Sequence, residues 1–326
     1  MSIKNLVNVK SVDAFCDAEK TKKGFTDAEA GGILIRNLEY IDPEIFKAQY
    51  PDNTLLSNGL SINNQGGYNE TLTSLKVTVV GSYASSEDNA NDSGKITAQT
   101  SKSSIGVIGR HAHSSWTKTQ IKQYEQQGQN LPSIYLEGHF EIYSQEVDEI
   151  GYTGISDLDG HTGLLNHAGF VTDVAPGASS TLTGQELYDE LAKLINAQRT
   201  LVKNTTAFQC DTMVMPTGVM NDASTKILNS NGSDKTVLAA LEDNFKGGGN
   251  VKKMTFLSSF RCDDVGGNSV TVVYSTAKQA MQMRIPVPLQ FDPISQVGSQ
   301  FANYSDYRIG GMDILENKGG RLLTGL

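Results

Sequence analysis

The chain has 326 residues, of which 38% are hydrophobic and 19% are charged, and its net charge is −9. These fractions are typical of a folded globular protein, and the acidic surplus argues against a nucleic-acid reader, which needs a basic face. The three cysteines are an odd number at wide spacing, so we expect no disulfide framework and a reducing compartment.

The first fifty residues are polar and predict an arm that lacks a core of its own. We expect no signal peptide there, and no stretch of the sequence approaches the ~20 apolar residues of a membrane span. In TLTSLKVTVVGSY (71–83), the residues Leu75, Val77 and Val79 alternate and therefore share one face of a predicted strand. Residues 84–104 are polar, and a second apolar stretch, IGVIGRHAHSSW, follows them. Strand, long polar tip and strand predict a projecting hairpin.

The next two segments predict helices. Thr117 and Gln120 have the spacing of a capping box, and Gly128 is placed to end that helix. In the long helix predicted over 132–150, Asn130 is the expected N-cap and Gly151 the expected end. Its apolar residues follow a 4-3-4-3 spacing and form one stripe: Leu136, Phe140, Tyr143, Val147 and Ile150. This stripe must face a core or a neighbour.

The second half mixes helices and strands. Thr183 and Glu186 predict a capped helix, CDTMVMP predicts a short buried strand ended by Pro216, and a third helix should be capped at Ser233 or Asp234. KKMTFLSSF, NSVTVVYS and AMQMRIPVPLQF predict one strand each. The stretch from Tyr304 to Gly320 predicts the last strand. The fold class predicted from these elements is α+β.

Few residues suggest chemistry. RHAHSSW places His111 and His113 on one face of a strand, a spacing that some metal sites use, and Asp157 or Asp159 could complete a metal-dependent enzyme. DLDGHTG begins like a calcium loop, but Thr162 stands where the EF-hand needs glycine. Phosphate-loop, nucleophile-elbow and C-x-x-C motifs are missing from the sequence. We therefore predict no catalytic, cofactor-binding or metal site, and the metal-dependent enzyme remains the second alternative.

The order of the segments carries a resemblance. The long helix is followed by GHTGLLN (160–166), and YRIGGMDIL (307–315) closes the chain. In this order, from about Phe25 to Leu323, the sequence resembles the major capsid proteins of tailed bacteriophages of the Hong Kong 97 type and, more distantly, the encapsulin shell proteins. The resemblance implies an N-terminal arm (1–68), an E-loop hairpin (69–110), a P-domain with a spine helix (111–176), an A-domain (177–280) and a return to the P-domain (281–326).

The resemblance also implies a function. The chain would self-assemble as hexamers and pentamers into an icosahedral shell that encloses phage double-stranded DNA without sequence-specific binding. It would be no enzyme and would use no cofactor, and its further partners would be portal, scaffold or decoration proteins, with no membrane. Assembly would take place in the bacterial host cytoplasm, and the product would be the virion. The first alternative is an encapsulin-like nanocompartment shell around a protein cargo.

Five residues are predicted to contact a neighbouring subunit: Lys95, Lys102, Arg110, Trp116 and Arg308. Arg308 is the candidate donor of an ion pair between subunits. Some relatives crosslink an E-loop lysine to a P-domain asparagine. For this chain the resemblance implies Lys95 or Lys102 as the lysine, with Asn303 or Asn317 as the acceptor.

Overall fold

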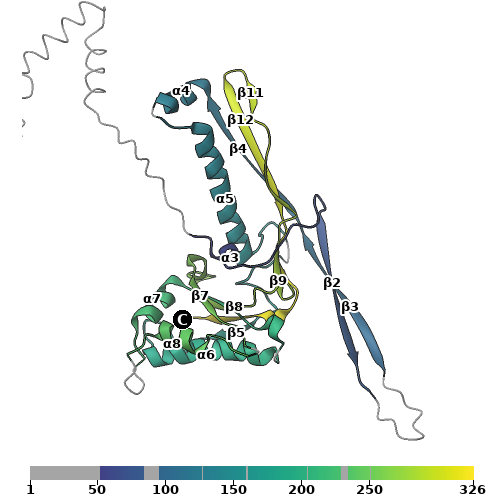
Figure 1. The fold of residues 1–326 in the computed structure, drawn as a ribbon, viewed down its shortest axis with the longest axis vertical. Coiled ribbons are helices and arrows are strands. Elements are labelled where there is room, and N and C mark those ends of the chain that lie inside the picture. The colour runs from purple at the N-terminus through teal and green to yellow at the C-terminus, as the bar shows by residue number, and fades with distance from the viewer. Residues whose placement is uncertain are drawn as a thin grey trace, which may run out of the picture. The chain divides into compact units, whose positions relative to one another are not determined.

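The computed structural model describes residues 52–83, 95–126, 128–158, 161–203, 205–228, 234–249 and 251–326. The chain divides into two units, Met1–Tyr50 with Gln126–Gln129, and Pro51–Glu125 with Asn130–Leu326. The second unit contains the elements described below (Figure 1). Of the arm predicted over 1–68, residues 1–51 lie outside the described residues, and the described part contains α3 (Thr54–Ser57) and β1 (Ile62–Asn63).

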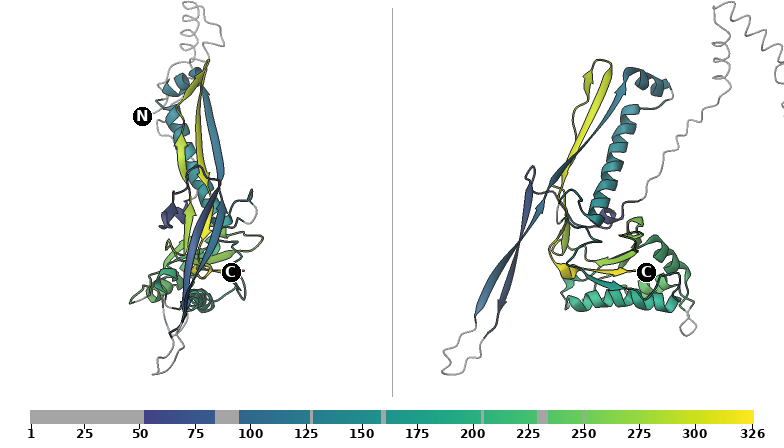
Figure 2. Two further views of the ribbon diagram at one scale, coloured as in Figure 1. Left: turned by 90° about the vertical axis from the view of Figure 1, so that its right-hand side faces the viewer. Right: turned by 180° about the vertical axis from the view of Figure 1, so that it is seen from behind.

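A long hairpin forms where the sequence predicts one, but its second strand is not the predicted one. β2 (Thr71–Gly81) pairs antiparallel with β3 (Ile96–Gly106), and the two strands extend together as a ribbon (Figures 1 and 2). β3 lies in the polar stretch that we predicted as the hairpin tip. That prediction was wrong because a two-stranded ribbon is held by backbone hydrogen bonds and does not require apolar side chains. Residues 84–94 lie outside the described residues.

The predicted second strand belongs to another sheet. β4 (Ile108–Thr117) pairs along its length with β12 (Gln300–Ile309), and β12 also pairs with β10 (Val287–Phe291) and β11 (Ser295–Val297). Two helices follow β4: α4 (Lys118–Gln126), with the predicted capping-box contacts between Thr117 and Gln120, and α5 (Leu131–Thr153). α5 lies beside this sheet (Figure 1).

α5 is the predicted long helix, with two corrections at its ends. Asn130 makes no side-chain cap, and Gly151 does not end the helix. Gly151 is buried within α5 against Leu55 of the short helix α3 (Thr54–Ser57), where a side chain would clash. The helix ends two residues later, and Gly154 follows with φ of 85°.

A five-stranded sheet forms most of the second half. Its order is β5 (Val171–Val174), β14 (Gly320–Thr324), β8 (Val270–Tyr274), β6 (Thr212–Met215) and β7 (Thr255–Ser258). Three α-helices accompany it: α6 (Gly184–Leu201), α7 (Thr217–Thr225) and α8 (Val237–Asn244). The short 3-10 helices are η2 (Thr206–Phe208), η3 (Phe260–Cys262) and η4 (Asn317–Gly319).

Of the helix N-caps predicted in this half, one is confirmed and one is wrong. The capping box of Thr183 and Glu186 is confirmed at α6. The cap of α8 is Thr236, whose side chain accepts from the Ala239 N–H, and not Asp234. The predicted cap Ser233 lies outside the described residues. β5 and β14 lie outside 177–280, yet they pair within the same sheet as β6, β7 and β8.

The closing stretch from Tyr304 to Gly320 contains the end of β12 and a new strand, β13 (Gly311–Ile314), so the prediction of one final strand was wrong. The chain changes direction at Gly311, whose φ of 71° favours glycine. β13 pairs with β9 (Met281–Arg284), which also pairs with β1 (Ile62–Asn63). AMQMRIPVPLQF thus supplies two strands, β9 and β10.

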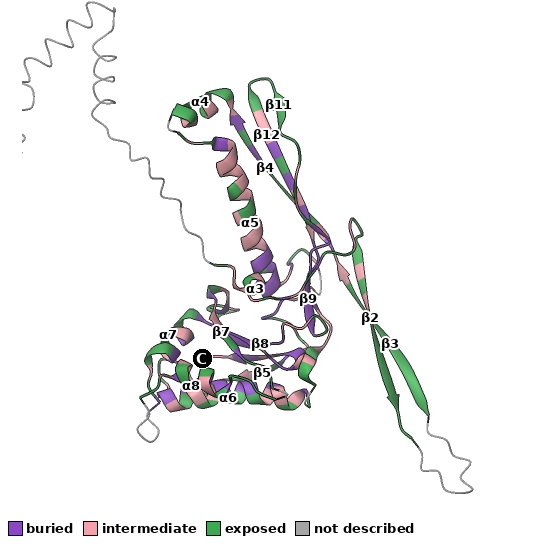
Figure 3. Ribbon diagram, viewed as in Figure 1, coloured by how far each residue is buried: buried purple, intermediate pink, exposed green. Residues whose placement is uncertain are grey.

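Two apolar cores stabilise the fold. One lies between the end of α5 and the strands β8, β9, β12 and β13, and it includes Tyr152, Leu164, Met283 and Ile309. The other lies between the five-stranded sheet and α6 to α8 and includes Leu187, Leu191, Met213 and Leu241. Figure 3 shows buried residues concentrated in these regions and exposed residues along the hairpin. Among the described residues, no helix has the length and apolar character needed to span a membrane.

Candidate assembly surfaces

One face of the hairpin is apolar and uncovered. Leu75, Val77 and Val79 alternate along β2, and Ile96 lies at the facing end of β3, so all four point to the same side of the ribbon. They are between 55% and 66% exposed. We name these four residues the apolar ribbon face. An exposed apolar patch of this kind marks an interaction site.

The opposite face of the hairpin bears polar side chains near its root, and these contact the rest of the same subunit. The Ser74 hydroxyl donates to an Asp313 carboxylate oxygen at 2.8 Å and accepts from Arg284 Nη2 at 2.6 Å. Lys76 forms an ion pair with Glu316. The polar face is therefore occupied near its root by the subunit itself, and the apolar ribbon face is available to a partner.

α5 also presents uncovered apolar side chains. Phe140 and Ile142 are 55% and 62% exposed, although both belong to a helix whose end is deeply buried. Phe140 contacts Phe291 of β10 with ring centroids 5.2 Å apart. The predicted stripe of α5 is thus buried towards Val147 and Ile150 but is open at Phe140, as expected for a surface that a neighbour covers.

A pocket of about 580 Å³ lies between α5 and β4. His139 of α5 joins the two elements because its ring nitrogens lie 3.1 Å from Ser114 Oγ and 2.8 Å from Ser305 Oγ. Burial, together with the nearby His113, lowers the pKa of His139. His139 therefore links α5 to β4 and β12 at one wall of this pocket, which the ion-paired Arg110 and Glu146 also line.

Of the five predicted contact residues, two lysines are exposed, whereas Arg110 is paired within the subunit. Lys95 and Lys102 are exposed on the hairpin. Arg110 forms ion pairs inside the subunit, with Glu146 at 3.2 Å and Asp157 at 3.0 Å. Both carboxylate partners of the Arg110 guanidinium therefore belong to its own subunit.

Trp116 is 3% exposed and stacks on Tyr135 of α5, with ring centroids 5.4 Å apart. The indole therefore packs between β4 and α5 and offers almost no surface to a neighbour. This packing brings β4 against α5, a contact that no local sequence pattern indicates.

Arg308 lies on β12 with its guanidinium over the Tyr68 ring, 5.7 Å from the centroid, and it also donates to the Tyr68 carbonyl. In the described part of the chain no carboxylate pairs with Arg308. The side chain is half-buried, so its charge remains available at the surface.

The two candidate crosslink acceptors differ in their surroundings. Asn303 is 2% exposed on β12, opposite Ser114, so a lysine of a neighbour could not reach it in this structure. Asn317 is hydrogen-bonded to His167, with 3.1 Å between Oδ1 and Nε2. Asn303 is therefore buried, whereas Asn317 lies at the surface of the subunit.

His111 and His113 do not form a metal centre among the described residues, where no group of three or more His, Cys, Asp or Glu side chains could hold an ion. His113 instead stacks on Tyr304, with ring centroids 5.7 Å apart. Asp157 pairs with Arg110, and Asp159 lies outside the described residues.

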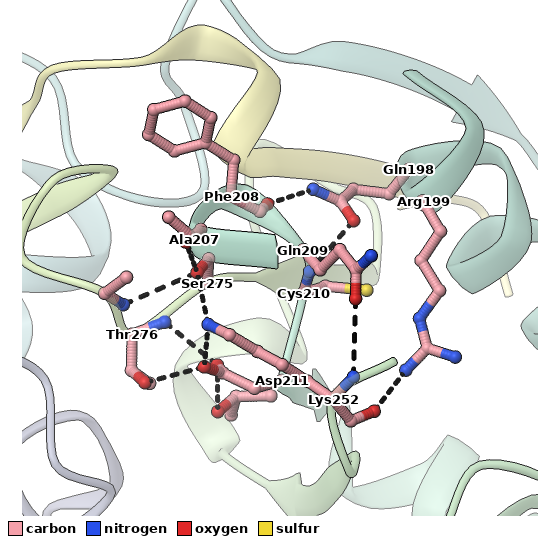
Figure 4. Close-up of polar contacts among 12 residues, drawn as sticks. Gln198, Arg199, Ala207, Phe208, Gln209, Cys210, Asp211, Lys252, Ser275 and Thr276 are labelled. Atoms are coloured by element: carbon pink, nitrogen blue, oxygen red, sulfur yellow. Dashed lines mark hydrogen bonds and ion pairs between the residues drawn. The ribbon is translucent and has the colours of Figure 1, made fainter. Parts of the chain in front are cut away.

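Sequence reasoning missed a polar network beside the start of β6 and the end of β8 (Figure 4). Asp211 accepts from Lys252 Nζ at 3.0 Å and from the Thr276 hydroxyl at 2.8 Å, and Lys252 Nζ also lies 3.3 Å from Ser275 Oγ. Ser275 is fully buried and donates to the Ala207 carbonyl, so no substrate can reach its hydroxyl. Beside it, burial raises the pKa of the Cys210 thiol to about 11. We interpret this network as structural, because its polar groups bond to one another.

Comparison with known proteins agrees with this picture of an assembly subunit. The family model described as major capsid protein matches residues 84–326. The capsid of Myoviridae phage XM1 is 40% identical over 89% of this chain and 98% of that chain, with a TM-score of 0.78.

Two less similar structures share the fold. The capsid of the native GTA particle is 13% identical over 91% of this chain and 97% of that chain, with a TM-score of 0.64. Mycobacterium phage Ogopogo is 11% identical over 90% and 98%, with a TM-score of 0.60. No curated protein sequence matches the chain. The predicted α+β fold and the predicted relationship are confirmed, and the chain belongs to the major capsid protein family of tailed phages, whose members form the capsid shell.

Proposed function

We propose that many copies of this chain assemble, as hexamers and pentamers, into a closed icosahedral shell that encloses double-stranded phage DNA. The observation that carries the proposal is the 40% identity to the capsid of Myoviridae phage XM1 over almost the whole of both chains. The apolar ribbon face and the exposed Phe140 and Ile142 add physical support, because a subunit alone leaves them in water.

Assembly would bury surface that the subunit cannot cover itself. Full burial of one large aliphatic side chain is worth roughly 1.5–3 kcal/mol, so Leu75, Val77 and Val79 together could contribute several kcal/mol at each contact. Ordering the contact offsets part of this gain. A hairpin that reaches a different surface on its neighbour makes a heterologous contact, and such contacts close into rings when the rotation allows it.

The part assignment that we propose keeps the bounds implied by the resemblance: arm 1–68, E-loop 69–110, P-domain 111–176, A-domain 177–280 and return segment 281–326. The hairpin of β2 and β3 supports the E-loop, and α5 supports the spine helix. Because β5 and β14 pair in the sheet of the A-domain, the P-domain range and the return segment both contribute a strand to it.

We infer that the role is structural and not catalytic. The buried state of Ser275 and Cys210 supports this inference. The net charge of −9 favours DNA enclosure without sequence-specific binding. Portal, scaffold or decoration proteins would be the further partners, and assembly would take place in the host cytoplasm before the shell becomes part of the virion.

Among the predicted inter-subunit residues, we propose Arg308, Lys95 and Lys102 as the ones that meet a neighbour. Arg308 has a charge without a carboxylate partner in the described residues, and both lysines are exposed on the hairpin. Arg110 and Trp116 are engaged within the subunit, so any contribution from them would act through the packing of β4 on α5.

The test is assembly of the full chain, expressed with and without the other head proteins of its phage. Negative-stain microscopy and sedimentation should show closed particles. A chain that stays monomeric under all these conditions would contradict the proposal. Nuclease-treated particles from phage-producing cells should release double-stranded DNA, whereas a protein cargo in place of DNA would favour the encapsulin-like alternative.

A further inference from the structure

The root of the hairpin is joined to the subunit through a buried ion pair. Asp313 of β13 is 1% exposed and Arg284 of β9 is 9% exposed, and the two pair with 2.9 Å between Arg284 Nη2 and Asp313 Oδ2. Ser74 of β2 bonds to both partners. Ser74 therefore connects the hairpin to the buried ion pair of Arg284 and Asp313.

The buried polar group around this ion pair spans all three strands of the sheet formed by β1, β9 and β13. Gln282 donates to Asp313 Oδ2 at 3.2 Å, and Asn63 donates to Gln282 Oε1 at 3.1 Å. Outside the buried group, Lys76 adds an ion pair with Glu316, which lies just beyond β13. We name Ser74, Lys76, Arg284, Asp313 and Glu316 the root cluster.

Beyond the root cluster the ribbon is unsupported. From Val77, the first residue after Lys76, to Gly81 along β2, and over the facing part of β3, the described residues form hydrogen bonds only within the hairpin. These five residues of β2 extend roughly 17 Å at the rise of a β-strand. A small rotation at the root would therefore displace the apolar ribbon face by a large distance.

We propose that the root cluster is a positioning device: it fixes the direction of the hairpin relative to the body of the subunit and thereby sets the curvature and diameter of the shell. The inference rests on the proposed closed shell. Arg284 and Asp313 bond to each other without Ser74, so the serine adds a directional link to a pair that is already formed. In some proteins a buried ionic group contributes more to the specificity of the geometry than to stability, and we infer that role for this pair.

Ser74→Ala is the sharpest variant because it removes the link and leaves the buried pair. Ser74→Thr keeps a hydroxyl and should restore the wild-type behaviour. Ser101→Ala is the matched control. Ser101 lies on the same face of the same hairpin, and its hydroxyl bonds only to the Lys76 carbonyl within the ribbon.

The experiment measures particle diameters by cryo-microscopy and the thermal midpoint of the unassembled subunit. Wild type, Ser74→Thr and Ser101→Ala should each give one shared diameter. Ser74→Ala should give a broadened or shifted distribution with a nearly unchanged midpoint. A Ser74→Ala shell of wild-type diameter would overturn the inference.

If Ser74→Ala does not yield a folded subunit, Lys76→Gln decides instead. Lys76 is 46% exposed, so the subunit should tolerate its loss. A changed diameter in Lys76→Gln supports the inference and an unchanged one overturns it. Wild-type chain that forms no closed shell at all would refute the proposed function itself, a result distinct from shells of unchanged diameter.

Discussion

Leu164 donates its backbone N–H to the Gly151 carbonyl at 2.9 Å, and this bond satisfies a carbonyl that α5 leaves unpaired at its end. The other carbonyls at the end of α5 also have hydrogen-bond donors. The last four carbonyls of α5 accept as follows: Ile150 from Gly154 N–H, Gly151 from Leu164 N–H, Tyr152 from Leu165 N–H and Thr153 from Asn166 Nδ2. The described part of GHTGLLN, HTGLLN (161–166), thus supplies three of these four contacts and caps the C-terminus of α5.

Gly163 makes this cap possible, and we predict that Gly163→Ala destabilises the subunit by roughly 1–3 kcal/mol, as overpacking does. A Cβ at Gly163 would lie inside contact distance of the Tyr152 carbonyl, which is backbone and cannot yield. Denaturant unfolding of the unassembled subunit measures the loss. Gly138→Ala, in the open middle of α5, should instead gain about 0.5–1 kcal/mol. Equal stability of Gly163→Ala and wild type would contradict the explanation.

The sequence was most informative where a signal is local. The capping box of Thr183 and Glu186, the 4-3-4-3 stripe of α5 and the apolar strand of β6 each depend on residues close together in the chain. The cap of α8 shows the limit, because Asp234 and Thr236 are both good caps and only packing selects Thr236.

The pairing of strands that lie far apart in the sequence could not be predicted from local patterns. β3 is polar, so only its register with β2 reveals it, and the insertion of β14 between β5 and β8 has no local mark. The root cluster joins Ser74 to Asp313, 239 positions apart. Its members are common polar residues, and the burial of Arg284 and Asp313 becomes apparent only when the strands meet.

The apolar ribbon face should be required for assembly but not for folding. We predict that Val77→Asp abolishes shell formation, because it would place a charge in the buried contact. The unfolding free energy of the subunit should change by no more than about 0.5 kcal/mol, as at other exposed sites. Thr78→Asp adds the same charge on the other face of β2 and should still assemble. Loss of assembly in both variants would indicate a general charge effect.

Arg308→Ala should impair assembly more than folding. Within the subunit Arg308 loses its contact with Tyr68, a cation–π interaction worth about 0.5–1 kcal/mol at an exposed site. Particle yield should fall much further if a neighbour's carboxylate pairs with the guanidinium. Arg308→Lys keeps the charge and should recover part of the yield. An equal loss of stability and assembly in Arg308→Ala would rule out the contact between subunits.

Asp148 offers a test of buried polarity, because its carboxylate accepts the Leu55 N–H at 3.0 Å and is 1% exposed. Asp148→Ala leaves that N–H unpaired and should cost roughly 1–3 kcal/mol. Asp148→Asn keeps an acceptor and should match or exceed wild-type stability at neutral pH, since burial raises the pKa of the Asp148 carboxyl. The advantage of Asp148→Asn should shrink as pH falls, because the folded wild type takes up its proton more readily than the unfolded chain. Urea unfolding at several pH values checks both points.

His161 should make the subunit less stable in mild acid. Its ring bonds to the Gly310 carbonyl at the turn between β12 and β13, and burial lowers the pKa of His161, although that bond and Asp313 oppose the shift. The unfolded chain therefore binds the proton first as pH falls below about 6.5, and the unfolding free energy decreases over that range. His161→Gln should flatten this dependence in part, since His139 has a pKa lowered in the same direction. Unfolding free energies between about pH 5 and 8 provide the measurement. Identical slopes for wild type and His161→Gln would contradict the prediction, because they would show that the pKa of His161 is the same in the folded and the unfolded chain.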